Sequence, residues 1–598
     1  MRRNLWKLLL ASAVVATVGA VGATIGSAGG KKSSAPKAGG TYRVAFDSSF
    51  GFTDAFDPTG EYLGQAFGIY SDLLIRTLVG YNHVAGAAGN TIVPDLARSV
   101  PKPTNAGKRY VFTLKNGIKF GPPVNREITS KDVAYAINRI LNPKDGAQYA
   151  FYFDVIKSMA TPNSKTIVFN LKEPTGDFLY RLSMPAAGPI PHEVGDCFNA
   201  QPGKYGRDLV SSGPYMIKGA DAVDASSCSK LQPMSGFDGQ TNMTLVRNPS
   251  YDPKTDTKTA RENLPDEFDF VVDTNNDDIF NKIQAGDLED EAGAQPSPRV
   301  MRTYVTNPSL KSNFHQNSGD RTWYITLNLT QAPFDDIHVR KAMNWVMDKD
   351  ALRKAWGGPT SGAIANHIVP DTLFNNQLLN FHPYKTAGDH GDASQARAEM
   401  MKSKYDPGHT GKCSAKACKG VLLVADARGQ DPGMVAVLQA DAAKIGITFT
   451  VRTIPGAYPT IQTPAKNVPI SERPGWGKDY ADALTFFQAL FTSGAIIKTG
   501  NTNYSLVGIT PAIAKKVGAK GNLDNIPTID PQFDHCSKLS GQPRLSCFEG
   551  IDKFLMNKVV PWVPYLQAAV VSITGPKVAK WQFDQFSGTT GYAHVAVK

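Results

Sequence analysis

The segment GWGKDYADALTFF, residues 475–487, places an acidic residue between two aromatic ones just before an apolar run. Asp479 lies between Trp476 and Tyr480, where a carboxylate could start a helix, brace a loop or hold a positively charged guest. Asp482 is well placed to cap a helix over ALTFFQALF, because its side-chain oxygen can accept free amide hydrogens of the first turn. Asp479 is then not needed as the cap, which makes it a candidate for cation binding.

Six cysteines fall into three pairs that are close in sequence, and an even count suits disulfides in an oxidising compartment. Among the 15 possible connectivities for six cysteines, we favour Cys197–Cys228, Cys413–Cys418 and Cys536–Cys547. The Cys413–Cys418 pair could instead be half of a metal site. No second Cys or His pair stands at the right spacing, so we expect no metal.

The sequence shows no catalytic motif. The ten histidines are scattered, and none belongs to H-E-x-x-H or to a close His/Cys/Asp cluster. There is no G-x-S-x-G, no phosphate-binding G-x-x-x-x-G-K-[ST] and no convincing G-x-G-x-x-G. We therefore expect a protein that is not an enzyme and needs no cofactor. A secreted hydrolase with a dispersed active site stays an alternative, because triads can be spread along a sequence.

Length and composition indicate a globular protein of two or more domains. The chain has 598 residues, of which 41% are hydrophobic and 20% charged, so a single core is not expected. The formal net charge is +11, but the basic residues are interleaved with acids. This pattern is compatible with weak attraction to an anionic cell envelope and gives no support for a nucleic-acid partner.

The N-terminus has the layout of an export signal. A basic start at Arg2 and Arg3 is followed by an apolar stretch from Leu8 and by small residues around Ala23 and Ala28. We assign residues 1–28 to this signal and 29–38 to a flexible tether. The predicted location is extracellular, cell-surface or periplasmic. The apolar stretch is also about long enough to cross a bilayer, so an uncleaved membrane anchor stays open.

The first folded part of the sequence reads as an α+β unit. Residues 69–81 predict an apolar helix that runs into a turn, and RYVFTLKNGIKF, residues 109–120, predicts a strand with a hairpin turn at Asn116-Gly117. A helix follows in ITSKDVAYAINRIL, with Thr129 and Asp132 suited to capping its start. TIVFNLK, residues 166–172, adds a second strand.

A second architecture begins near residue 318. RTWYITLNLT, residues 321–330, alternates as a half-buried strand does, and residues 336–356 predict one long amphipathic helix. In that helix, Arg340 and Asp348 are expected to form an ion pair or to act as caps. Residues 420–454 then read as strand, helix and strand, which is the mark of a parallel pair in an α/β domain.

Several of these segments together resemble one known family. IYSDLLIRTLVGY, RYVFTLKNGIKF with ITSKDVAYAINRI, SSGPYMI, LVRNPSYDP, TLNLTQAPFDDIHVRKAMNWVMDKDAL and GWGKDYAD occur in the order that the family shows. The family is that of extracellular solute-binding proteins of ABC transporters that take oligopeptides, dipeptides or nickel. Three features depart from it: no Cys follows the signal, so lipid anchoring is not expected; KFGPPVNREIT replaces the turn usual in the family; and Ala483 stands where Pro is common.

The resemblance implies an α/β fold of the two-lobed periplasmic-binding-protein type, in its large, peptide-binding form, with an extra α+β subdomain inserted in the first lobe. Carried onto this chain, lobe I comprises residues 39–85, 206–317 and 558–598. The inserted subdomain comprises residues 86–205, and lobe II residues 318–557. This division agrees with the break near residue 318 that the sequence itself indicates.

The resemblance also implies a function. The protein would be a monomeric receptor that captures a peptide or similar small polar solute between its lobes and delivers it to ABC permease subunits. Asp479 would capture the α-ammonium group of the ligand, Trp476 and Tyr480 would form walls, and Asn328 would lie near the cleft. Two alternatives stay open: Asp479 braces its own turn with both aromatics in the lobe core, or the fold serves a sensory or adhesive surface protein.

Overall fold

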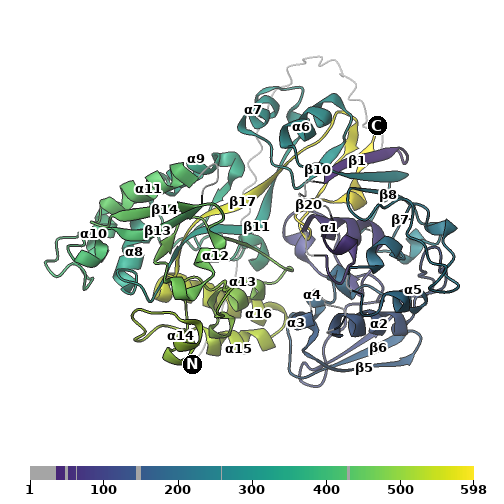
Figure 1. The fold of residues 1–598 in the computed structure, drawn as a ribbon, viewed down its shortest axis with the longest axis horizontal. Coiled ribbons are helices and arrows are strands. Elements are labelled where there is room, and N and C mark those ends of the chain that lie inside the picture. Colours follow the sequence, from purple (N-terminus) through teal and green to yellow (C-terminus); the bar gives the residue numbers. More distant parts are fainter. Residues whose placement is uncertain are drawn as a thin grey trace, which may run out of the picture. The chain divides into compact units, whose positions relative to one another are not determined.

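The computed structural model describes residues 36–46, 52–61, 64–142, 144, 150–201, 203–257, 259–426 and 431–598 (Figure 1). The predicted export signal, residues 1–28, and most of the predicted tether lie outside the described residues. Within the described ranges, no helix combines the length and the apolar character that a membrane span requires.

One lobe is built on a five-stranded sheet with the strand order β10-β1-β9-β8-β7. Strand β1, which lies between β10 and β9, is parallel to both neighbours and has Tyr42, Val44 and Phe46 buried in a large apolar core. Ala45 packs instead among side chains of α6 and α7. The bounds are β1 Thr41–Phe46, β7 Tyr215–Ile217, β8 Asn242–Arg247, β9 Glu267–Val272, β10 Asp290–Ala292, α6 Asn276–Ala285 and α7 Pro298–Thr306.

An α+β unit shares the core of this first lobe. Its antiparallel sheet has the order β4-β6-β5, and α2 begins with the predicted capping box of Thr129 and Asp132. The bounds are β4 Arg109–Thr113, α2 Ser130–Leu141, α3 Ala150–Phe153, β5 Ile156–Asn163, β6 Thr166–Leu171, α4 Phe178–Arg181 and α5 His192–Gly195.

One local prediction for this lobe is wrong, and another is confirmed only in part. The hairpin predicted at Asn116-Gly117 is not formed, although the chain does turn at Gly117, whose φ is 77°. Strand β4 pairs with the distant β6 instead. Among the described residues, the only β-bridge made by the segment just after the turn is Lys119–Glu127. The helix predicted for residues 69–81 is present in its first part, where α1, Gly64–Gly68, continues as a π-helix over Ile69–Leu74. It ends before Ile75, whose backbone is extended with φ −122° and ψ 129°. The next residue, Arg76, is fully buried and is held by Asp95, with 2.7 Å between Nε and Oδ1.

The second lobe is built on a seven-stranded sheet with the order β12-β17-β11-β15-β13-β14, in which β16 also pairs with β11. The predicted strand, helix and strand of residues 420–454 are confirmed as β13, α11 and β14, and the two strands are parallel. The bounds are β11 Phe314–Leu327, β12 Gly362–Ile364, β13 Val421–Asp426, α11 Asp431–Ala443, β14 Phe449–Ile454, β15 Ile470–Ser471, β16 Gly475–Gly477 and β17 Trp562–Ile573.

Two predictions for the second lobe need correction. The end of β11 is buried on both faces, not half-buried, because the strand lies in the middle of the sheet and Tyr324 and Ile325 enter different cores. The single helix predicted for residues 336–356 is divided into α8, Ile337–Val346, and α9, Lys349–Trp356. Asp348 causes the break because its Oδ1 accepts the Ala351 amide at 2.7 Å and so starts a new helix.

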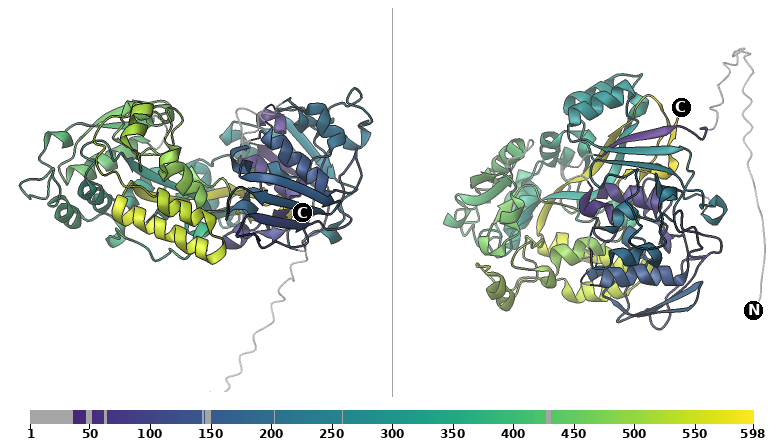
Figure 2. Two further views of the ribbon diagram at one scale, coloured as in Figure 1. Left: turned by 90° about the horizontal axis from the view of Figure 1, so that it is seen from below. Right: turned by 45° about the vertical axis from the view of Figure 1, so that its right-hand side comes forward.

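The long antiparallel strands β11 and β17 connect the two lobes (Figures 1 and 2). Ile573 packs with the α6 and α7 side chains of the first lobe, whereas Ile325 and Val563 pack in a core of the second. Between these ends the pairing register shifts at residues 318–322. The two strands therefore change partners and cores along their length, with an irregular segment between.

The remaining helices of the second lobe surround its sheet. Their bounds are α10 Ala393–Met400, α12 Tyr458–Ile461, α13 Leu484–Phe491, α14 Pro511–Val517, α15 Asp530–Lys538 and α16 Gly541–Phe554. Short two-stranded ladders complete the chain: β2 Val79–Gly80 with β3 Val93–Pro94, β18 Val578–Lys580 with β21 Ala596–Val597, and β19 Phe583–Asp584 with β20 Thr589–Thr590.

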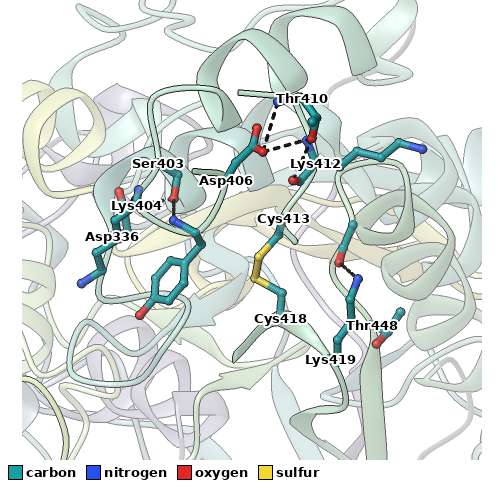
Figure 3. Close-up of a disulfide and its surroundings, with 12 residues drawn as sticks. Asp336, Ser403, Lys404, Asp406, Thr410, Lys412, Cys413, Cys418, Lys419 and Thr448 are labelled. Carbon is teal, nitrogen blue, oxygen red and sulfur yellow. Dashed lines mark hydrogen bonds between the residues drawn. A yellow bond between two sulfur atoms is a disulfide. The ribbon is translucent and has the colours of Figure 1, made fainter. Parts of the chain in front are cut away.

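The three predicted disulfides, Cys197–Cys228, Cys413–Cys418 and Cys536–Cys547, are all formed. Figure 3 shows Cys413–Cys418, which joins the loop after α10 to the segment just before β13. Both of its cysteines are buried in the apolar core that contains α8 and α11. The structure thus has these two cysteines bonded to each other, as the favoured pairing predicts.

Candidate ligand-binding site

A cavity of about 1200 Å³ is lined by both lobes. The first lobe contributes side chains from α1, from α3 and from the loop between β19 and β20, and the second contributes β16 and the helices α13 and α15. The aromatic and charged side chains of the lining are Phe67, Phe151, Tyr152, Arg321, Tyr458, Trp476, Lys478, Asp479, Tyr504, Asp530, Phe533, Asp534 and Phe586.

Strand β16 delivers the predicted acidic residue into this cavity. Gly475 pairs with Trp323 of β11, and a side chain is excluded there because a Cβ would lie 2.3 Å from a Trp323 ring carbon. The chain can therefore pass flat over the indole, and after Gly477 it leaves the sheet with Lys478 and Asp479 in the cavity lining. Gly475 thus allows the close approach to Trp323 that positions Asp479.

The carboxylate of Asp479 meets a side chain of the other lobe. Its Oδ2 accepts a hydrogen bond of 2.6 Å from the Tyr152 hydroxyl. Burial raises the pKa of Asp479, and the Tyr152 hydrogen bond and the charge of Arg321 act in the opposite direction. Burial disfavours the charged form of Asp479 more than the Tyr152 and Arg321 contacts favour it. A cationic group in the cavity would therefore stabilise that charged form further.

Trp476 forms part of the wall. Its Nε1 donates to the Thr485 carbonyl oxygen at 3.0 Å, so the indole is fixed by its polar edge while the ring lines the cavity. The first lobe supplies aromatic area through Phe586, which stacks on Tyr81 with 4.4 Å between ring centroids. Rigid aromatic walls of this kind bury ligand area without ordering flexible side chains.

Lys478 ties the lobes together next to Asp479. Its Nζ donates to Asn90 Oδ1 at 2.8 Å and to the Gln585 carbonyl oxygen at 2.6 Å, both in the first lobe. It also forms an ion pair with Asp320 of β11. This lysine is therefore occupied by protein partners, although it lies beside the candidate cation-binding acid.

Three buried ionisable residues, Asp72, His83 and Asp584, hold the loop between β19 and β20 that carries Phe586. The Asp584 carboxylate accepts the Phe586 amide at 3.0 Å and the Ser587 amide at 3.2 Å. His83 Nδ1 lies 3.4 Å from Asp584 Oδ2 and 2.8 Å from Asp72 Oδ1. Burial lowers the pKa of His83, but the two carboxylates outweigh it and raise that pKa to about 10.

The same three residues, Asp72, His83 and Asp584, have a spacing that a metal ion could use. A proton on His83 satisfies this geometry because it gives a cation between two carboxylates. Both acids also accept backbone amides, as Asp72 Oδ2 does from Ala593 at 3.2 Å. We therefore interpret this group as a charged histidine that fixes the cavity wall.

The other predicted site residues have protein partners. Tyr480 is fully buried in the core of the first lobe, where its hydroxyl donates to Asp177. Asn328 is buried outside the lining of the large cavity; its Nδ2 donates to the Val468 carbonyl oxygen at 3.0 Å. Asp482 accepts the Leu484 amide at 2.8 Å, at the start of α13, and is also bound by Arg544.

Sequence reasoning missed the first-lobe half of the cavity. Tyr152, Phe67 and Phe586 lie far apart in the sequence and carry no motif. Only their arrangement around Asp479 brings them into one site. Arg321 is the first residue of a predicted strand, and no motif marks it as a lining residue either.

The fold and the cavity define the class of protein: a two-lobed α/β protein with a ligand-sized cavity between its lobes. A sequence profile of the bacterial extracellular solute-binding proteins, family 5, matches residues 91–497. This match covers more than half of the chain. The protein belongs to this family of solute-binding proteins.

Individual relatives extend the match to most of the chain. The dipeptide-binding protein of Escherichia coli (strain K12) is 23% identical over 483 residues, which is 76% of this chain and 80% of that protein. The probable di/tripeptide-binding protein 5 of Pseudomonas aeruginosa (strain UCBPP-PA14) is 23% identical over 552 residues, or 88% of this chain and 90% of that protein.

Solved structures show the same fold. The clavulanic acid biosynthesis oligopeptide binding protein 2 superposes with a TM-score of 0.75 at 22% identity, covering 94% of this chain and 96% of that one. The periplasmic binding protein DppA from Helicobacter pylori, in complex with the peptide STSA, gives a TM-score of 0.65 at 18% identity, covering 94% of this chain and 99% of that one. The periplasmic-binding-protein fold that the sequence predicted is confirmed.

Proposed function

We propose that this protein is the extracytoplasmic substrate-binding receptor of an ABC importer, and that it captures peptides or similar small polar solutes in the cavity between its lobes. It would deliver them to ABC permease subunits and carry out no bond-breaking chemistry. The observation that carries this proposal is the cavity itself, because both lobes line it and the Asp479 carboxylate lies in its wall. The names of the relatives, which include dipeptide- and di/tripeptide-binding proteins, support it.

The size of the cavity favours a guest larger than a single amino acid. Its volume of about 1200 Å³ exceeds the roughly 300–1,000 Å³ that is usual for small-molecule pockets. A peptide of several residues fits such a space together with water. Hydrated pockets tolerate different side chains, because water can bridge the polar groups that the protein does not contact directly.

Within this cavity, Asp479 is proposed to bind the ligand's ammonium group. A charge-assisted hydrogen bond to the carboxylate contributes about 1.5–3 kcal/mol. The ammonium group would take the place of, or join, the Tyr152 hydroxyl, which donates to the same carboxylate. Trp476 would supply wall area and cation–π attraction. Tyr480 and Asn328 have protein partners and are left out of the proposed site.

Ligand capture would use closure of the lobes about β11 and β17. The predicted domain bounds stay as given from the sequence: residues 39–85, 206–317 and 558–598 for lobe I, 86–205 for the insert and 318–557 for lobe II. The register shift at residues 318–322 lies at the proposed junction and suits a hinge, because an irregular ladder resists bending less than a regular one. We also propose that the mature protein is exported and monomeric.

The first experiment is native mass spectrometry of protein purified without denaturation, before and after refolding has removed any bound solute. The stripped protein is then offered a tripeptide library with free N-termini and the same library N-acetylated. Replacing Asp479 by Ala should weaken the free peptides about tenfold or more and leave the acetylated ones nearly unchanged. An equal loss for both libraries would contradict the ammonium role.

A control variant and a second readout complete the design. Asp534 is an exposed acid of the same lining, so Asp534→Ala tests whether any negative charge in the cavity suffices. We expect it to have a clearly smaller effect on free peptides. Cleavage of any library member by the wild type would favour the hydrolase alternative instead.

A further inference from the structure

One corner of the second lobe contacts both the cavity and the first lobe. We call residues 530–547, which comprise α15, the turn after it and the start of α16, the latch corner. On one side its residues Asp530, Phe533 and Asp534 line the cavity. On its other side it meets the segment around Asp177 of the first lobe. Movement of this corner would therefore affect both the cavity wall and the contact between the lobes.

The backbone contact at this corner requires a glycine. The Gly176 amide donates to the Ser537 carbonyl oxygen at 2.9 Å. A Cβ at Gly176 would lie 1.7 Å from the Leu539 carbonyl oxygen and 2.7 Å from Arg544 Nη1. Because 1.7 Å from a backbone atom is far inside van der Waals contact, any larger residue at position 176 must push the latch corner away.

A buried set of charges lies next to this contact. Arg544 binds Asp482 through two hydrogen bonds of 2.9 and 2.8 Å within the second lobe. Its Nη2 lies 3.8 Å from Oδ1 of Asp177 in the first lobe, and Asp177 is paired with Arg181 at 2.9 Å. The Tyr480 hydroxyl also donates to Asp177 across the lobes. All five side chains are at least nine-tenths buried.

The contacts of this set that cross the lobes converge on Asp177, because each lobe already pairs one carboxylate with one guanidinium group of its own. Two carboxylates and two guanidinium groups form the set, and the Asp177 carboxylate receives Arg544 and Tyr480 from the opposite lobe. Buried ion pairs seldom add much net stability, but separation of the lobes at the latch corner would take the Tyr480 hydroxyl and the Arg544 guanidinium group away from the buried Asp177 carboxylate. The set therefore favours one docked position of the latch corner.

The latch contacts are connected to the candidate ligand-binding acid. Arg181, which pairs with Asp177, also donates to the Tyr152 carbonyl oxygen at 2.7 Å. The hydroxyl of the same tyrosine donates to Asp479 at 2.6 Å. One continuous series of contacts thus runs from the cavity to the latch corner.

A disulfide braces the latch corner. Cys536 lies in α15 and Cys547 in α16, and the bond closes the turn between the two helices. In the last turn of α15 the carbonyl oxygens of Cys536 and Ser537 accept hydrogen bonds from Arg544 Nη1 at 3.2 and 2.8 Å. The bond therefore holds together the groups that meet Gly176 and Asp177.

We propose that the latch corner is a closing device that draws the lobes together by contacts outside the ligand, and that the Cys536–Cys547 bond is needed for it to dock. Ligand affinity then depends on the latch, because a ligand that binds the closed form gains from a larger closed population. This consequence for affinity rests on the proposed function, whereas the effect on closure does not.

The test compares Gly176→Ala with Gly550→Ala in the full mature chain. Gly550 lies in α16, and a Cβ there would meet nothing within 4 Å, so this variant controls for a glycine change in the same region. With bound solute removed, small-angle X-ray scattering should give a larger radius of gyration for Gly176→Ala than for wild type and Gly550→Ala. Hydrogen exchange should be faster in residues 175–182 and 536–545 of Gly176→Ala alone.

The disulfide is tested in the same way with a matched pair. The double variant Cys536→Ser/Cys547→Ser should reproduce the larger radius of gyration and the faster exchange in residues 175–182. Cys413→Ser/Cys418→Ser should not, because that bond lies in a different core, among α8, α9 and α11. The residues labelled around it in Figure 3 do not belong to the latch corner.

Affinity for free tripeptides should fall by about tenfold in both latch variants. A larger radius of gyration with no tripeptide binding by any protein, wild type included, would support the latch and contradict the proposed ligand class. Unchanged scattering and exchange in both latch variants, each with the melting temperature of wild type, would overturn the latch. If Gly176→Ala changed scattering and exchange but Cys536→Ser/Cys547→Ser did not, the role of the disulfide would be overturned.

Discussion

Replacing Arg544 by Met is expected to destabilise the second lobe strongly. The guanidinium group is 5% exposed, binds Asp482 through two hydrogen bonds and lies 3.8 Å from Asp177. It also donates to the carbonyl oxygens of Cys536 and Ser537. Met has a similar length and fills much of the same volume, so the change removes the charge and the donors without a large cavity.

The magnitude follows from what is left behind. Removing one partner of a buried ion pair costs about 3–5 kcal/mol because the remaining charge stays buried without compensation. Here Asp482 loses its paired cation within the lobe. For a lobe of this size, each kcal/mol shifts the melting temperature by about 2–4 °C. The expected decrease in the melting temperature is therefore about 6–20 °C.

Differential scanning calorimetry at pH 7 measures this decrease, with Lys553→Met as the matched control. Lys553 lies in the same helix α16, is 47% exposed and faces Glu549 at 3.9 Å. Surface pairs of this kind contribute about 0–1 kcal/mol, so the control should melt within a few degrees of wild type. The reasoning would be refuted if both variants melted at the same temperature, because burial would then not decide the cost of losing a cation.

Two further predictions concern the rest of the fold. The pKa of His83 is raised to about 10, so its charge stabilises the folded state fully below pH 6.5, and this contribution is lost as the pH rises from about 6.5 to 10. The difference in melting temperature between wild type and His83→Gln should therefore shrink across that range. A constant difference would contradict a charged histidine. Removing Cys197–Cys228, whose residues are 31 positions apart, should destabilise the protein by about 4 kcal/mol, because a disulfide that closes a longer loop restricts the unfolded chain more. Removing Cys413–Cys418, with a separation of 5, should cost about 2 kcal/mol. Urea unfolding of the two double serine variants compares these costs, and the reverse order would contradict the chain-entropy explanation.

Local signals in the sequence predicted the elements that depend on neighbouring residues. The capping box of Thr129 and Asp132 and the parallel pair β13 and β14 are present as expected. The hairpin at Asn116-Gly117 is wrong because β4 finds its partner in β6, about fifty residues later. The predicted long helix is divided because Asp348 caps a new start, which competes with a continuous apolar face.

The candidate site could be predicted only in part. Asp479 and Trp476 lie in one short motif, and both line the cavity. Tyr480 belongs to the same motif, but its side chain points into the core of the other lobe, which a sequence pattern does not reveal. Tyr152 comes from a distant segment and reaches Asp479 only because the two lobes meet. Contacts between lobes are set by tertiary packing and leave no local spacing in the sequence.

The central claim, that the two lobes enclose a solute beside Asp479, is tested most directly by a crystal structure of the protein with its co-purified or library-selected solute. We expect electron density for the solute in the cavity lined by Trp476 and Tyr152, with a cationic nitrogen about 2.7–2.9 Å from the Asp479 carboxylate. A solute bound outside this cavity, or one whose cationic group lies away from Asp479, would contradict the account.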